Sequence, residues 1–182
     1  MPTATAAAEN AAAEKQEKRQ ATIDKRTNFF PGMKRKLTLD DWSPKHNGES
    51  EKRVLINFEM PISGQAVTGI PVYLTEPLKD LERSTELDKI SLNTEIENMS
   101  LDIYDTPDSR EECQTVHSAT LRKFEMVRRD DIVLLCFNTT VVRTMKLLKF
   151  LHDYEAKTVF VEFSPTQAEI GKDAQQMTLK AS

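Results

Sequence analysis

The sequence predicts an α+β fold, with a single mainly antiparallel sheet of about five strands and two packed helices. Apolar residues alternate with other residues in several short runs, which is the period of a half-buried strand, and two further runs have helical spacing. The middle strands are separated by turns too short for a crossover helix. That part of the sheet is therefore predicted to be antiparallel.

The 182 residues divide into three parts by composition. Residues 1–52 form a basic, Ala-rich N-terminal arm and linker, with ten Lys and Arg against eight Asp and Glu, predicted to be disordered or partly helical. Residues 53–166 form the core domain, which is acidic, and residues 167–182 form a loose C-terminus. The boundary near residue 50 rests on the shift in charge and on Pro44 and Gly48, which are typical of a solvated connection.

The first elements of the core domain are a strand and a helix. Every second residue from 54 to 60 is apolar, and Val54, Ile56, Phe58 and Met60 should share one side of a half-buried strand. Thr75 is the predicted N-cap of a short helix that ends near Arg83, and Pro77 falls in its first turn, where a missing N–H costs nothing. The predicted inner face of this helix consists of Leu74, Leu78 and Leu81.

The middle of the chain is predicted to form further strands. Apolar and polar residues alternate along residues 90–105 in two phases, and the change of phase at Glu97–Asn98 predicts a bulge or a tight turn. Residues 119–140 predict two strands of a hairpin with a charged tip at Arg129–Asp131. The second strand, Ile132–Phe137, is apolar throughout, which is typical of a central strand covered on both faces.

The core domain is predicted to end with a helix and a strand. Asn138, Thr139 and Thr140 are N-cap candidates for a helix from about Val141 to Tyr154. Residues 157–165 then alternate as a strand.

No catalytic, metal or cofactor motif is present in the sequence. The chain has five glycines, and none is arranged as a phosphate-binding loop. Cys113 and His117 match the residue types of thiol catalysis without a supporting signature. We therefore predict a protein that is not an enzyme and has no cofactor and no metal; a thiol-dependent hydrolase is a distant third possibility.

The segment NFFPGMKRK, residues 28–36, places two phenylalanines among charges. Phe29 and Phe30 could begin the core, with the arm packed on the sheet. They could instead form the anchor of a docking peptide, whose shape is preset by the Pro-Gly turn and which is flanked by charged residues. We predict the second, so that removal of residues 1–36 leaves the domain folded. The predicted partner is a protein or a neighbouring subunit, and the predicted partner-binding residues are Phe29, Phe30, Lys34, Arg35, Lys36 and Trp42.

Single-strand nucleic-acid binding is the alternative function. Basic residues of the arm would neutralise phosphates, and its aromatic rings would stack on bases. The acidic core domain disfavours this unless one hairpin carries a basic patch, for which the residues are Arg122, Lys123, Arg128 and Arg129. No run of residues is long and apolar enough for a membrane span, and two cysteines with no secretory signal predict a cytoplasmic protein.

Overall fold

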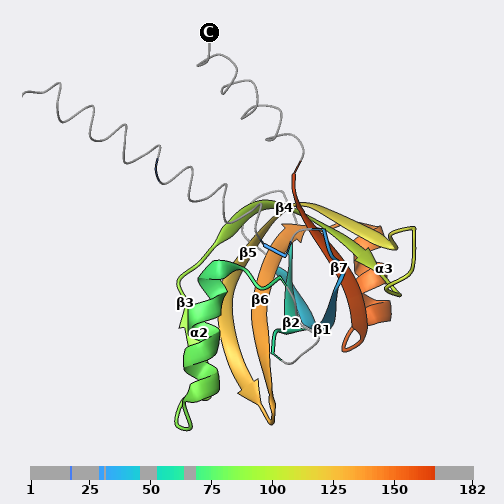
Figure 1. The fold of residues 1–182 in the computed structure, drawn as a ribbon. Coiled ribbons are helices and arrows are strands. Elements are labelled where there is room, and N and C mark those ends of the chain that lie inside the picture. Colours follow the sequence, from blue (N-terminus) through green and yellow to red (C-terminus); the bar gives the residue numbers. More distant parts are fainter. Residues whose placement is uncertain (1–16, 18–28, 31, 46–52, 64–68, 167–182) are drawn as a thin grey trace, which may run out of the picture.

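A computed structural model describes residues 29–30, 32–45, 53–63 and 69–166, together with Glu17 (Figure 1). These residues form one antiparallel sheet of seven strands and two helices. The strands are β1 Arg35–Lys45, β2 Arg53–Pro61, β3 Lys89–Leu92, β4 Ile96–Tyr104, β5 Gln114–Arg129, β6 Ile132–Val142 and β7 Thr158–Pro165; the helices are α2 Val72–Arg83 and α3 Met145–Tyr154.

Six of the strands form a ring, which we call the closed sheet. β5, β4, β7, β1, β2 and β6 are neighbours in that order, and β6 pairs again with β5. β3 lies outside the ring and pairs with the C-terminal part of β5. In Figure 1 the six strands surround a common interior, with α2 and α3 on different sides of it.

The predicted α+β class with about five strands is wrong. Strands account for 54% of the described structure and helices for 18%. One cause is β1, which lies inside the range assigned from composition to the arm and linker. β1 is an internal strand of the closed sheet, because it pairs with β2 on one side and with β7 on the other.

The predicted hairpin is confirmed, and bulges bend its long first strand. β5 has 16 residues and pairs with β6 up to the turn. Within it, Ser118 and Lys123 have positive φ angles of 52° and 53°, and the register with β6 shifts between Arg122 and Glu125. A bulge increases the local twist of a strand, so β5 can follow the curvature of the ring.

The bulge predicted at Glu97–Asn98 is also present. Asn98 has a φ of 56°, and the register between β4 and β5 shifts between Ile96 and Met99. β6 lies between β2 and β5, as expected for a central strand. Ile132 is nevertheless 44% exposed, so the outer side of this strand is not covered along its whole length.

The two helices differ from the predicted ones at their N-termini. α2 begins at Val72 rather than at Thr75, but it buries the predicted Leu74, Leu78 and Leu81. α3 begins at Met145 with Thr144 as its N-cap, whose side chain accepts a hydrogen bond from the amide of Leu147. The residues predicted to cap α3, Asn138–Thr140, continue β6 instead.

Phe29 and Phe30 lie in the core of the closed sheet. Their exposed fractions are 0% and 1%. Phe29 makes edge-on contacts with Phe124 of β5, Phe137 of β6 and Phe163 of β7, at ring-centroid distances of 5.7, 6.1 and 4.9 Å. One side chain therefore joins three strands of the ring from the inside. Phe29 and Phe30 belong to the core, which was the first of the two interpretations of NFFPGMKRK, and not the one we predicted.

Replacement of Phe29 by Ala should destabilise the fold strongly. It removes a fully buried ring, and such truncations cost about 3 to 5 kcal/mol in free energy of unfolding. Urea denaturation followed by circular dichroism measures this change. Phe160→Ala, on the half-buried outer side of β7, is the matched control and should cost much less.

A chain that begins at Thr27 should keep the stability of the full chain, whereas removal of residues 1–36 should not, because that deletion takes away both buried rings and the start of β1. Equal stability of the wild type and Phe29→Ala would show that this ring does not hold the core together.

Candidate functional site

The predicted partner-binding residues are mostly engaged within the fold. Phe29 and Phe30 are buried, and Trp42 is half-buried against the core. The ammonium of Lys34 lies 3.5 Å from the ring centroid of Tyr104, and the Arg35 guanidinium lies 4.8 Å from that of Phe30. Lys36 is exposed. The six residues therefore do not form one exposed docking surface in this structure.

The predicted nucleic-acid patch is engaged with neighbouring groups at three of its four positions. Arg129 makes a two-pronged ion pair with Glu59, with N···O distances of 2.9 and 2.5 Å, which raises the pKa of Arg129. Arg122 pairs with Glu95, and Arg128 donates to the Ser84 carbonyl at 2.7 Å. Paired cations have less charge to offer a phosphate. Lys123 is exposed but lies beside carboxylates, as described below.

The Cys113 and His117 pair has no geometry that favours thiol chemistry. Burial raises the pKa of Cys113, whose Sγ lies 3.1 Å from the Ile103 carbonyl as its hydrogen-bond donor. His117 Nδ1 instead lies 3.3 Å from the hydroxyl of Ser100. A nucleophilic thiol needs a lowered pKa and an adjacent base, so these contacts argue against the hydrolase interpretation.

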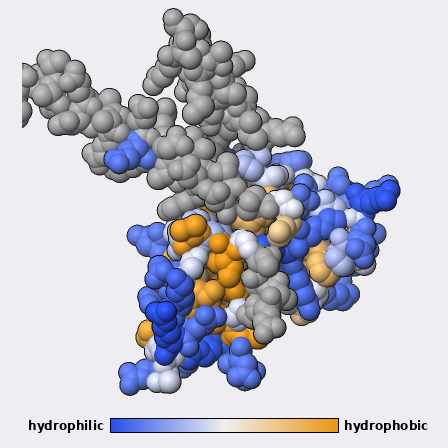
Figure 2. All heavy atoms as spheres, in the orientation of Figure 1, coloured by the Kyte–Doolittle hydropathy of each residue, from blue (hydrophilic) through white to orange (hydrophobic). Residues whose placement is uncertain are grey.

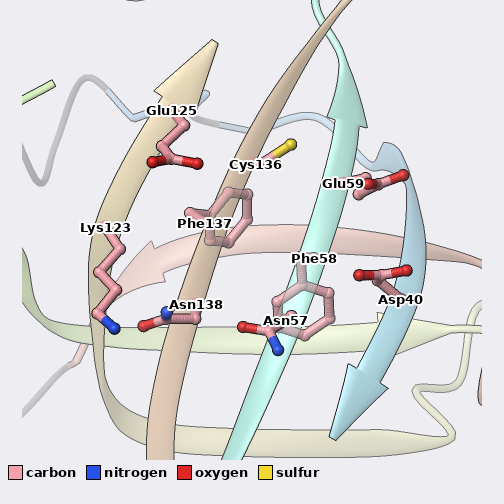
Figure 3. Close-up of a pocket in the computed structure, with 9 residues that line it drawn as sticks. All are labelled: Asp40, Asn57, Phe58, Glu59, Lys123, Glu125, Cys136, Phe137 and Asn138. Carbon is pink, nitrogen blue, oxygen red and sulfur yellow. The ribbon is translucent and has the colours of Figure 1, made fainter. Parts of the chain in front are cut away.

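A polar hollow lies on the outer side of β1, β2, β6 and β5, with a volume of about 230 Å³ (Figure 3). Glu59, Cys136 and Glu125 stand in one cross-strand row, because Cys136 pairs in register with both glutamates. Asp40 and Lys123 complete its charged lining. Glu59 is paired with Arg129, and Glu125 lies 2.7 Å from the Lys89 ammonium.

The surroundings of Cys136 disfavour its thiolate form. Burial is the main cause that raises its pKa to about 11, and Glu59 adds to the shift. The hollow therefore has neither a thiolate nor, among the described residues, a group of ligands that would hold a metal ion. We assign it no chemistry.

An acidic strip lies on the outer side of β4 and β7. We define it as Asp102, Glu162 and Glu112 beside Tyr104. Asp102 and Glu162 are in register on neighbouring antiparallel strands, and neither has an ion-pair partner among the described residues. The three carboxylates contribute to the raised pKa of Tyr104, whose largest cause is burial. The strip therefore combines negative charge with an aromatic ring that already contacts one lysine.

A crevice of about 360 Å³ lies where β5 and β6 separate, next to the N-terminus of α3. The two strands are paired as far as Thr120 and Thr140, and beyond that point residues 114–118 and 141–142 diverge. Neither the strip nor the crevice is predicted from the sequence. Neither has a local signal. The strip forms from β4 and β7, which are distant in sequence, and the crevice forms where β5 and β6 separate beside Arg53 of β2 and the start of α3. The crevice lining consists of Arg53, Gln114, Thr115, Val116, His117, Ser118, Thr140, Val141, Val142, Thr144 and Leu147.

The remaining surface is mainly polar. Hydrophilic residues dominate the described part of the face in Figure 2, and hydrophobic ones reach the surface beside α2. Val72, at the start of α2, is 87% exposed. Single exposed apolar residues are ordinary on protein surfaces and do not by themselves define a docking site.

Comparison with known proteins found no family model, no curated protein and no solved structure that matches this chain. Among the described residues, no helix is both long enough and apolar enough to cross a membrane.

The raised pKa of Cys136 predicts slow alkylation. With a pKa of about 11 instead of 9.0, the thiolate fraction at pH 8 is about a hundredfold lower than in the unfolded chain. The rate of iodoacetamide labelling, followed by intact mass in a Cys113→Ser background, should rise with pH up to about 11. Because folding disfavours the thiolate, this group should also lower the stability of the fold as pH rises from 9.0 to about 11.

Labelling of the folded chain at pH 8 as fast as that of the chain in urea would contradict the assignment. Cys136→Ser in the same background is the control, since it should abolish the signal.

Proposed function

We propose that this chain is a non-enzymatic interaction or assembly protein, whose basic N-terminal arm docks on a protein partner or a neighbouring copy of the chain. The receiving surface is the acidic strip. The observation that carries the proposal is the pairing of Asp102 with Glu162 on adjacent strands.

Two like charges directly opposite each other on a sheet are destabilising. A pair of this kind has no evident role in holding the closed sheet together, since the core beneath it is apolar. A cation from another segment or another molecule would stabilise the pair of Asp102 and Glu162. The Lys34 ammonium over the Tyr104 ring is an example, from the same chain, of a cation held at this surface.

The arm has the complementary charge. Between residues 15 and 26 the sequence contains Lys15, Lys18, Arg19, Lys25 and Arg26 against Glu17 and Asp24. Phe29 and Phe30 fix the point at which this segment leaves the core, so the two rings serve as an anchor for the arm rather than as its docking residues. Opposite charges on the arm and on the acidic strip would accelerate the encounter of the two surfaces and fix their relative orientation.

Single-strand nucleic-acid binding is less well supported, because Arg122, Arg128 and Arg129 are engaged with neighbouring groups. We also propose a cytoplasmic location. Cys113 and Cys136 are both free thiols, which is typical of a reducing compartment.

A labelled peptide of residues 13–28 should bind in trans to a chain that begins at Thr27. Fluorescence anisotropy should show binding that weakens as salt is raised, because charged groups carry the interaction. The double variant Asp102→Asn, Glu162→Gln should lose most of the binding. Its stability should be equal to or slightly above that of the wild type, since the variant removes a repulsion of about 0.2 to 1 kcal/mol.

Asp130→Asn, Asp131→Asn is the matched control, because it changes the net charge by the same amount at the exposed hairpin tip. It should bind like the wild type. If the peptide does not bind at low salt, or if both double variants weaken binding equally, docking of the arm on the acidic strip is excluded. Light scattering of the full chain then reports whether copies associate at all.

A further inference from the structure

Beside the crevice, one edge of β5 has no strand partner among the described residues. On its other edge β5 pairs with β4 from Gln114 to Leu121, but its pairing with β6 begins only at Thr120. Residues 114–118 of β5 all line the crevice. Side chains of a strand alternate between two faces, so five consecutive lining residues indicate that the crevice meets the edge of β5. We call this opened part of the ring the seam.

An open strand edge is a place where one more strand can add. It presents a row of N–H and C=O groups, which pair with an extended segment. Apolar side chains are exposed at the rim of the same crevice: Val142 of its lining is 53% exposed, and Met145, which follows Thr144 of the lining, is 78% exposed. An extended segment in the seam would cover both the unpaired backbone and this apolar rim.

The described part of the chain ends close to the seam. The amide of Thr166 donates to the Asn98 carbonyl at 2.9 Å, just beyond the end of β7 beside β4 (Figure 1). Pro165 pairs with Met99 of β4, and Met99 pairs with Ala119 of β5. Because neighbouring strands lie about 4.8 Å apart, a strand added to the open edge of β5 would lie about 15 Å across the sheet from β7.

Residues 176–180, QMTLK, lie outside the described part of the chain and have the sequence pattern of a short strand. Met177 and Leu179 alternate with polar residues, so they share one face when the segment is extended. The nine residues 167–175 can span about 30 Å, and Gly171 among them allows the chain to reverse. β7 runs parallel to β5, since both are antiparallel to β4. A chain that turns back after β7 therefore runs antiparallel to β5.

We propose that residues 176–180 add to the open edge of β5 of their own chain as a short antiparallel strand, which begins beside Ser118 and ends beside Gln114. The face that carries Met177 and Leu179 covers the apolar rim of the crevice. Attachment within one chain favours this contact, because a short flexible linker gives an effective concentration in the millimolar range. The inference uses no residue of the acidic strip or the basic arm and goes beyond the proposed function, so either can fail without the other.

Amide hydrogen exchange of the full chain, measured by ¹H–¹⁵N NMR, tests this contact. The variant Met177→Asp, Leu179→Asp should speed exchange of the amides that β5 directs to the seam by about tenfold, which corresponds to a segment docked about 90% of the time. It should also shift the amide resonances of residues 142–147. Ile170→Asp, Ala174→Asp is the matched control, because it changes the net charge equally within the linker. It should leave exchange and resonances as in the wild type.

A nitroxide label reports the direction of the added strand and the chain that supplies it. The label is attached at Ala181→Cys, just beyond the proposed strand, in a Cys113→Ser, Cys136→Ser background. Antiparallel docking should broaden the amide resonance of Gln114 more than that of Ala119. A mixture of ¹⁵N-labelled chains without nitroxide and nitroxide-labelled chains without ¹⁵N should show no broadening, because the segment docks on its own chain.

Faster exchange in Met177→Asp, Leu179→Asp but not in the control, together with preferential broadening of Gln114, would establish the added strand. The proposal is overturned if the seam amides exchange equally fast in this variant and in the wild type. It is also overturned if Ala119 is broadened more than Gln114. Broadening in the mixed sample would overturn it as well, and would assign the seam to a segment of a neighbouring copy.

Discussion

The aromatic contacts around Phe29 are the interaction on which the closed sheet depends. A ring of six strands has an interior that only large side chains can fill, and Phe58, Phe124, Phe137 and Phe163 supply four of them from four strands. Phe29 enters this group from outside the sheet and contacts three of those rings. The segment that precedes β1 is therefore part of the core, and the acidic strip lies on a frame that it holds together.

The sequence predicted the elements whose local pattern agrees with their place in the fold. β2 alternates without interruption, and α2 presents three leucines to the core. β1 was missed for a physical reason. Its register with β2 shifts between Leu39 and Trp42, so both Asp40 and Asp41 are exposed and the alternation breaks in the middle of the strand. A bulged strand of this kind has the composition of a linker.

The start of α3 and the binding surfaces show a second limit. Thr139 is a good N-cap by residue type, yet its side chain is buried inside the closed sheet and the cap is Thr144. The acidic strip needs the pairing of β4 with β7, and the crevice needs the divergence of β5 from β6. Both depend on where strands of the sheet pair and where they separate, which residue spacing alone does not contain. Charge asymmetry between the arm and the core domain was the one part of the proposed function that composition could predict.

The pairing of β1 with β7 also constrains how the protein folds during synthesis. Of the strands in the described residues, β1 comes first and β7 last, yet the two pair with each other, Arg35 with Val161. During synthesis the edge of β1 that receives β7 has no partner until about 130 further residues have emerged, and an unpaired edge is prone to pair with other chains. The ring cannot close on a nascent chain that lacks residues 158–165. A chain that ends between β6 and β7 therefore lacks the strand that joins β1 to β4, and exposed apolar surface of that kind makes incomplete chains prone to aggregation.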